Sequence, residues 1–69
     1  MSTDPVKAFG RRVQALRHER GFSQEKLAAK VGAHRTYLGM LERGERNPTL
    51  RMIYRVAAAL SVAPTKLIE

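Results

Sequence analysis

Residues 23–44 read SQEKLAAKVGAHRTYLGMLERG, and this stretch predicts two short helices joined by a glycine turn. Ser23 is a preferred N-cap residue, so the first of these helices begins beside it. Gly32 ends that helix after about two turns, and Gly44 ends a second helix predicted over about residues 34–43. Helices of this length are marginal in isolation, so both depend on packing against other elements.

A longer helix is predicted before this stretch, over about residues 5–20. Asp4 offers an acceptor at the N-cap position, and Pro5 occupies the first helical position, where a missing N–H does no harm. Gly21 supplies the left-handed residue that ends a helix. Between these signals an apolar stripe recurs at helical spacing and is expected to face the core: Val6, Phe9, Val13 and Leu16.

Two further helices are predicted after the stretch. Asn47-Pro48 forces an extended segment, and Thr49 then offers an N-cap to a fourth helix. A last helical turn is expected over residues 64–68, with Leu67 directed inward. The apolar stripe of the fourth helix consists of Leu50, Ile53, Val56, Ala57 and Leu60.

Length and composition favour a single folded domain that spans residues 1–69. A chain of this size buries about 60% of the surface that its unfolded form exposes. Hydrophobic residues make up 43% of the chain, which argues against disorder. No segment alternates apolar and polar residues in the manner of a strand, and there are no internal repeats. The sequence therefore predicts an all-α, compact five-helix domain with a helix-turn-helix at about residues 23–43.

The chain is strongly basic, which favours an anionic partner. Thirteen Lys and Arg against six Asp and Glu give a net charge of +7. Nucleic acid, an anionic membrane surface and a merely solvated basic surface are all compatible with that count. The basic residues are spread over several short helices, which disfavours a membrane-surface peptide. With no signal peptide and no run of about 18 apolar residues, we expect a cytoplasmic protein with no membrane contact.

Nothing in the sequence predicts an enzyme, a metal site or a cofactor. The absence of cysteine excludes disulfides and thiolate metal sites. His18 and His34 lack metal-ligand spacing, and no carboxylate pair, Ser-His-Asp order or phosphate-cradling glycine loop occurs. Function is therefore expected to depend on binding rather than on catalysis.

On a helical wheel, the helix predicted over residues 34–43 divides into two faces. The apolar face carries Tyr37, Leu38 and Leu41, and the opposite, donor-rich face carries Arg35, Thr36, Gly39, Met40 and Arg43. An arginine fork can bond O6 and N7 of guanine together, and a threonine can meet several bases or a thymine methyl. The donor-rich face therefore suits a DNA major groove, with Arg35 and Thr36 as base readers.

Several residues of this helix allow two interpretations. Gly39 costs about 1 kcal/mol of helix stability relative to Ala, so we interpret it as making room for close approach to DNA, with a neutral glycine as the alternative. Met40 touches a thymine methyl or covers the rim of the core. Tyr37 belongs to the core or contacts a base or phosphate. His34 contacts a phosphate when protonated, or is a partly exposed residue at the helix start.

The helix predicted over residues 34–43 is the expected recognition helix, the one that enters the major groove. Phosphate contacts are expected on both sides of it. Ser23 and Gln24 stand where free backbone N–H groups converge at a helix start. Arg43, Arg46 and Asn47 lie just beyond the recognition helix, where they can grip the DNA backbone. A solvated polar loop is the alternative for each of the last three.

The chain resembles the Cro and cI type of helix-turn-helix protein, the large lambda-repressor-like (XRE) family, over residues 11–68. The resemblance rests on Ser23-Gln24-Glu25-Lys26-Leu27-Ala28, Val31-Gly32, Leu41-Glu42-Arg43-Gly44 and Asn47-Pro48-Thr49-Leu50, in that order and spacing. It implies the five-helix lambda-repressor-like fold and sequence-specific binding of DNA. Within the family, Arg35-Thr36-Tyr37, Glu42-Arg43 and Arg46-Asn47 look most like restriction-modification controller proteins, where equivalent positions contact operator DNA.

The resemblance also implies roles outside the recognition helix. Arg17 pairs with Glu42 and so joins the first helix to the third in a structural contact. A dimer contact near the C-terminal end is supplied by Tyr54, Val62, Leu67 and Ile68, with Leu67 dividing its area between core and interface. Two positions depart from the family pattern and leave the starts of the third and fifth helices open: His34, where a small hydroxyl residue is usual, and Ala63, a poor N-cap.

Together, the residues and the resemblance predict a transcriptional regulator. Its homodimer is expected to read a roughly palindromic operator, with half-sites about one helical turn apart. Double-stranded DNA and a second copy of the chain are the expected partners, and RNA polymerase is a further candidate. The alternative is an antitoxin, or an adaptor that binds a protein through a helical face while DNA binding is secondary.

Overall fold

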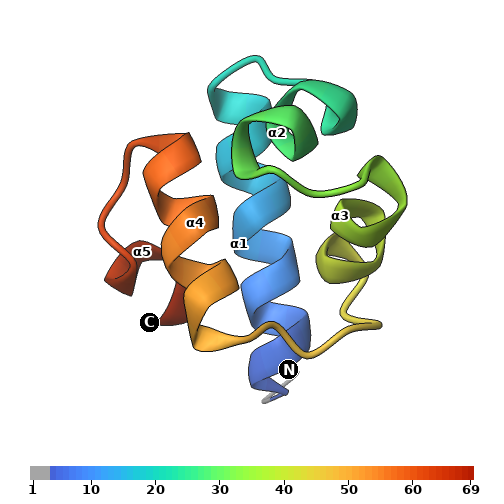
Figure 1. Ribbon diagram of the computed structural model, residues 1–69. Helices are drawn as coiled ribbons and strands as arrows, with labels where there is room; N and C mark the ends of the chain where they lie inside the picture. The colour runs from blue at the N-terminus through green and yellow to red at the C-terminus, as the bar shows by residue number, and fades with distance from the viewer. Residues whose placement is uncertain (1–3) are drawn as a thin grey trace.

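The chain folds into helices at each of the five predicted places. The computed structural model describes residues 4–69, and its helices are α1 (Pro5–Glu19), α2 (Gln24–Val31), α3 (Arg35–Glu42), α4 (Leu50–Leu60) and α5 (Thr65–Ile68) (Figure 1). Within these residues there is no strand, which confirms the all-α prediction. The observed ends differ from the predicted ones by one residue, because Arg20, His34, Arg43 and Pro64 are caps rather than helical residues.

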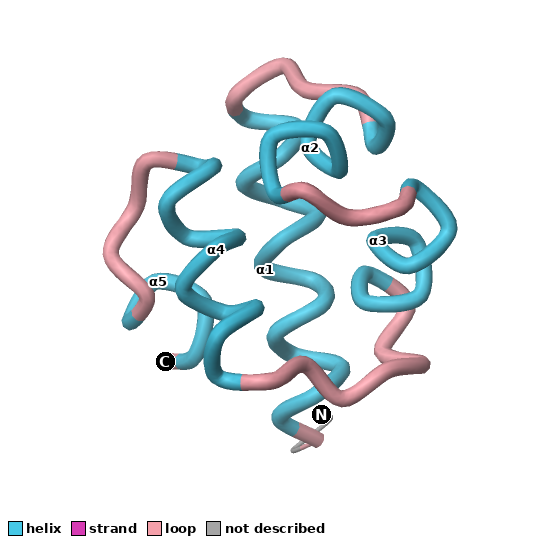
Figure 2. Tube along the Cα trace, in the orientation of Figure 1, coloured by secondary structure: helices cyan, strands magenta, loops and turns pink. Residues whose placement is uncertain are grey.

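Helix α1 runs through the middle of the molecule, and the other helices pack around it (Figure 2). Helices α2 and α3 pack on one another, and α3 also packs along α1. Helices α4 and α5 contact α1 on its other side, so α3 lies at the opposite edge from them (Figure 1). Placement at the edge leaves one face of α3 free of other helices.

Four side chains cap the helix starts that the sequence indicated. Oδ1 of Asp4 accepts from the N–H of Val6 at 2.9 Å, and the hydroxyls of Ser23 and Thr49 each accept from the third residue on at 3.1 Å. At the start of α3, Nδ1 of His34 accepts from the N–H of Thr36 at 3.0 Å. The imidazole thus fills the capping role of the usual small hydroxyl. Helix α5 has Pro64 at its N-cap and no side-chain capping bond.

The core receives side chains from every helix. Its buried apolar members are Phe9, Val13, Leu27, Ala28, Val31, Leu38, Leu41, Val56, Ala57, Leu60 and Leu67. The prediction that Leu50 belongs to this inward stripe is wrong, because its side chain is 69% exposed at the first position of α4. Apolar spacing identifies the face of a helix but not which end of that face another helix covers.

Leu67 requires a second correction. It was expected to share its area between the core and a dimer interface, but its exposed fraction is 0%. The side chain of Leu67 therefore offers no surface to a second copy. Leu16 and Val6 of the first stripe are only partly buried, and Leu16 packs against the core.

Gly10 sets the distance between α1 and α3, a role that the sequence does not indicate. A Cβ built at this position lies 2.6 Å from the carbonyl oxygen of Glu42 and also collides with the carbonyl of Leu41. Gly10 is buried and helical, so glycine is required here because it lacks a side chain and not because of its backbone freedom. It lets the C-terminal turn of α3 approach the backbone of α1 directly.

Candidate nucleic-acid interface

A buried ion pair joins the recognition helix α3 to α1. Nε of Arg17 donates to Oε2 of Glu42 at 2.6 Å, and Nη2 donates to Oε1 at 3.0 Å. Nη1 of Arg17 also donates to the carbonyl of Phe22 at 2.9 Å. The pairing that the resemblance implied is therefore present, and since Arg17 is 7% exposed and Glu42 is 6% exposed, the pair lies in the interior.

Gln24 extends this pair to the helix-turn-helix. Its Nε2 donates to Oε1 of Glu42 at 3.1 Å, which connects the first residue of α2 to the last residue of α3. The sequence predicts only a phosphate contact for Gln24 and gives no sign of this partner. Three elements therefore meet at one carboxylate, and the orientation of α3 is fixed by hydrogen bonds as well as by apolar packing.

The first turn of α3 presents the two expected base readers to solvent. Arg35 and Thr36 are both exposed, and His34 caps the turn from which they project. Nη1 of Arg35 lies 3.8 Å from Oε1 of Glu25 on α2, and both side chains are largely exposed. An exposed pair at this distance contributes little to stability, so Arg35 is free to exchange it for a ligand.

Gly39 does not have the surroundings that the helical wheel indicated. It was interpreted as making room for DNA, but it is buried. A Cβ at this position would lie 3.2 Å from Nη1 of Arg43 and 3.7 Å from Nε2 of Gln24. The space above Gly39 is thus occupied by two side chains of the protein itself, and its role in close approach to DNA stays a prediction.

Tyr37 and Met40 flank the exposed face of α3. Tyr37 is partly buried and packs against the core, and the guanidinium of Arg46 lies over its ring, 5.5 Å from the centroid. This geometry is that of a cation–π contact. Met40 is also partly buried, but within residues 4–69 it is not among the apolar side chains packed against the core.

Arg43, one of the expected phosphate contacts beyond α3, is hydrogen-bonded to the exposed carboxylate of Glu45. Nε and Nη2 of Arg43 donate to the carboxylate of Glu45 at 2.9 and 3.3 Å. This hydrogen bond lowers the pKa of the Glu45 carboxyl and raises that of the Arg43 guanidinium. Asn47 is exposed in the same loop, and Ser23 is exposed at the start of α2, where its hydroxyl caps the helix.

The expected dimer contacts divide into two groups. Tyr54 on α4 is 59% exposed and Ile68 at the end of α5 is 55% exposed. Val62 is partly buried against the core, and Leu67 is fully buried. Leu50, which the sequence analysis assigned to the core, joins Tyr54 on α4 as an exposed large apolar side chain, one turn earlier.

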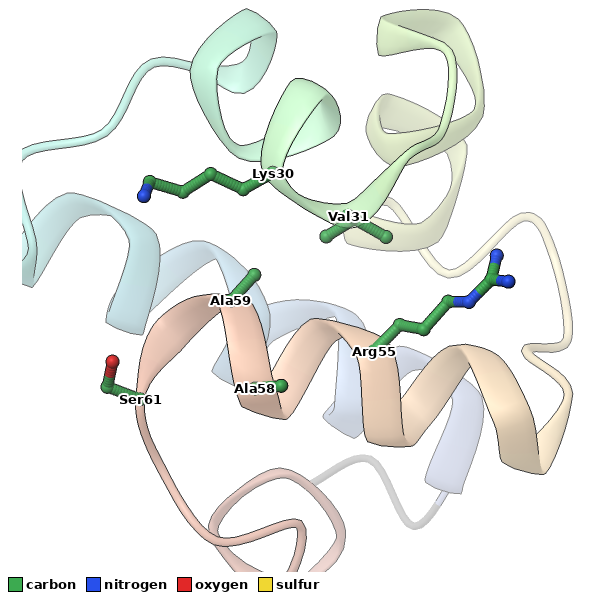
Figure 3. Close-up of a pocket in the computed structure, with 6 residues that line it drawn as sticks. All are labelled: Lys30, Val31, Arg55, Ala58, Ala59 and Ser61. Atoms are coloured by element: carbon green, nitrogen blue, oxygen red, sulfur yellow. The ribbon is translucent and has the colours of Figure 1, made fainter.

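A shallow groove lies on another side of the molecule, between the end of α2 and α4 (Figure 3). Figure 3 shows Lys30 and Arg55 extending toward opposite ends of the groove, with Ala58 and Ala59 between them. Lys30 also lies over the ring of Phe22, with Nζ 5.2 Å from the centroid. The groove presents small apolar and basic groups and no carboxylate.

Residues 4–69 contain no group of three or more His, Asp or Glu arranged to hold a metal ion. In the same part of the chain, none of the helices has the length and apolar content needed to cross a membrane.

Comparisons with known proteins agree with this geometry. The helix-turn-helix family model matches residues 13–67. The HTH-type transcriptional regulator y4dJ of Sinorhizobium fredii is 42% identical over 65 residues, which are 94% of this chain and 84% of that protein. These matches cover nearly all of the elements described above.

Two solved structures share the fold and a substantial part of the sequence. The restriction-modification controller protein C.AhdI from Aeromonas hydrophila superposes with a TM-score of 0.88 and 45% identity, over 96% of this chain and 98% of that chain. The biofilm master regulator SinR, solved in complex with DNA, superposes with a TM-score of 0.84 and 34% identity, over 88% and 98% of the two chains. The chain therefore belongs to the XRE-type helix-turn-helix family of DNA-binding transcriptional regulators.

Proposed function

We propose that this protein regulates transcription by binding, as a homodimer, to a roughly palindromic operator. The observation that carries the proposal is the fixed presentation of α3. The Arg17–Glu42 pair and Gln24 lock one end of the helix, while Arg35 and Thr36 project from the other end into solvent. A rigid helix with exposed donors is suited to the major groove, where base edges differ in their donors and acceptors.

Within this proposal, Arg35 and Thr36 read bases, and Tyr37 and Met40 border the contact. A well-placed bidentate side chain discriminates against the wrong base by about 1–3 kcal/mol. Met40 is partly exposed without a place in the core, which favours its DNA-facing role. Tyr37 combines a core role with a role at the interface. Its ring packs on the core, and the guanidinium of Arg46, an expected phosphate contact, lies over the ring.

Phosphate contacts come from both flanks of α3. Ser23 and the free N–H groups at the start of α2 form one flank, and a helix start favours an anion. Arg43, Arg46 and Asn47 form the other flank. Because these contacts neutralise phosphates, they set the register of the protein on DNA and make its affinity depend on salt.

A homodimer is supported by the exposed apolar side chains at the far side of the molecule. Leu50, Tyr54 and Ile68 are each more than half exposed. Two copies that pair through this surface are expected to present their α3 helices to one duplex, with half-sites about one helical turn apart to match the dimer symmetry. Leu67 takes no part in this contact, because it is fully buried in the protomer.

The controller role is the more specific form of the proposal. Similarity to C.AhdI extends over 96% of this chain and 98% of that controller protein. The regulator then acts in the cytoplasm on a promoter, where the position of the operator decides between repression and activation through RNA polymerase. Protein concentration then controls occupancy of the operator through dimerisation.

The test is a selection of genomic fragments by the purified protein, followed by fluorescence-anisotropy titrations of the retained fragments at several salt concentrations. Specific binding predicts retained fragments that share a palindrome, and an affinity that falls steeply with salt. A random-sequence duplex of equal length is the control. If no sequence is enriched over random DNA, the protein is not a specific regulator.

A further inference from the structure

The pair formed by Arg43 and Glu45 lies where the proposed interface requires a free arginine. Nε and Nη2 of Arg43 both donate to Glu45, and the remaining Nη1 is folded over Gly39, 3.2 Å from where a Cβ would stand. In this position Glu45 occupies the Nε–Nη2 edge of the guanidinium and places a negative charge beside it. Arg43 must leave Glu45 before a phosphate can take that edge.

The backbone holds Glu45 beside Arg43. The N–H of Gly44 donates to the carbonyl of Leu41 at 3.1 Å, and the N–H of Glu45 donates to the carbonyl of Met40 at 2.9 Å. This is the Schellman arrangement of hydrogen bonds, and it requires the left-handed conformation that Gly44 adopts with φ of 74°. The turn therefore returns residue 45 to the end of α3, so the pair is built into the helix ending.

Gly39 also belongs to this arrangement. Without a side chain, it leaves the surface of α3 open for the Arg43 guanidinium to lie against the helix. A larger residue would have to displace Nη1, which approaches to within 3.2 Å of the Cβ position. In this structure Gly39 gives room for the retracted arginine.

Two kinds of DNA complex place different demands on Arg43. Sequence-independent binding depends on phosphate contacts alone, and each neutralised phosphate steepens the dependence of affinity on salt. On an operator, base contacts by Arg35 and Thr36 fix the protein closer to the duplex. A phosphate held in that fixed position can replace Glu45 as the partner of Arg43, whereas a loosely bound duplex cannot.

We propose that Glu45 is a specificity-determining residue, which keeps Arg43 retracted on DNA that lacks the operator and releases it on the operator. This inference rests on the proposed function. It goes beyond that function because it assigns part of the discrimination between operator and other DNA to Glu45, whose carboxylate touches no base. Glu45 acts through Arg43, so it is a positioning residue rather than a DNA contact.

The experiment compares wild type with Glu45→Gln on two duplexes, the selected operator and a random sequence, over a range of salt concentrations. On random DNA, Glu45→Gln is expected to raise affinity several-fold and to steepen the slope of log K against log salt by about 0.9, the value for one more phosphate contact. On the operator the slope stays unchanged, because Arg43 is already released there. The ratio of operator affinity to random affinity therefore falls.

A double-mutant cycle separates this effect from simple charge removal. Arg43→Gln and Arg43→Gln/Glu45→Gln complete the cycle, and circular dichroism checks that all four proteins fold. If Glu45 acts through Arg43, Glu45→Gln changes nothing on random DNA once Arg43 is glutamine. If Glu45 merely repels phosphates, the gain persists in that background, and the proposal is overturned.

Equal changes in slope on operator and random DNA also overturn the proposal, since Arg43 would then be used alike in both complexes. Failure of the proposed function has a different signature. In that case wild type itself binds operator and random duplexes equally. The cycle on random DNA still shows whether Glu45 restrains Arg43, so the two ideas fail separately.

Discussion

Arg17 on α1 and Glu42 at the end of α3 form two hydrogen bonds in the protein interior, at 2.6 and 3.0 Å. The carboxylate also accepts from Nε2 of Gln24 at 3.1 Å, and the guanidinium also donates to the carbonyl of Phe22. Both charges are thus paired and hydrogen-bonded, as burial of charge requires. The arrangement orients the recognition helix without using any group on its exposed face.

Arg17→Met is expected to destabilise the fold by about 3–5 kcal/mol, because Glu42 loses its counter-charge in the interior. A chain of this length has a total stability of only about 3–10 kcal/mol, so the variant will be largely unfolded or close to it. Urea denaturation followed by circular dichroism measures the change. Arg17→Met/Glu42→Leu is the control and should recover most of the loss. A single variant as stable as wild type would contradict this role.

Gly10→Ala tests the close approach of α1 and α3. Helix propensity alone predicts that alanine stabilises a helix by about 1 kcal/mol relative to glycine. The added methyl group, however, meets the carbonyl oxygens of Leu41 and Glu42, which cannot move independently of the helix. We therefore expect a loss of about 1–3 kcal/mol, seen as a lower Tm. A raised Tm would show that the helices can separate at no cost.

Leu50→Lys and Tyr54→Lys are expected to weaken dimerisation without unfolding the protomer. Both side chains are mostly exposed in the protomer, so lysine is accepted there but is costly in an apolar interface. Sedimentation velocity should show a shift toward monomer, and operator binding should need more protein. Ala29→Lys, at an exposed position on α2, is the matched control. If both variants form dimers as stable as those of wild type, the dimer interface does not include Leu50 and Tyr54.

The Glu45 carboxyl is expected to titrate below the ordinary range of a glutamate, because Arg43 donates hydrogen bonds to its charged form. A lowered folded pKa means that the pair stabilises the folded state fully above the unfolded pKa. That contribution is lost as pH falls through the lowered value. An NMR titration of the carboxyl carbon measures the pKa, and Arg43→Gln should return it to the ordinary range. An unchanged pKa in that variant would mean that Arg43 is not its partner.

Much of the fold was predictable because its signals are local. Caps such as Ser23 and Thr49 and the helix-ending Gly21 and Gly32 act through their own backbone neighbours. Apolar spacing then identified the inward faces. The Arg17–Glu42 pair was predictable only from the family resemblance, because the apolar spacing within a helix says nothing about two residues so far apart in the chain.

The missed features all depend on tertiary neighbours. Gly10 looks like any helical glycine until α3 is placed against it, and Gly39 looks exposed until Arg43 folds over it. Leu50 fits the apolar stripe, but no helix covers the start of α4 there. Glu45 carried no signal in the sequence. Its importance follows from the turn at Gly44, which brings its carboxylate back to Arg43.

The base-preference profile of Arg35→Ala shows whether the exposed face of α3 reads the operator. Wild type and variant are each used to select from a pool of randomised duplexes, with Arg46→Ala as the control for a phosphate contact. We expect Arg35→Ala to lose about 1–3 kcal/mol of discrimination at one position in each half-site, and Arg46→Ala to weaken binding to all sequences alike. If Arg35→Ala keeps the full wild-type preference at every position, the exposed face of α3 does not read the operator.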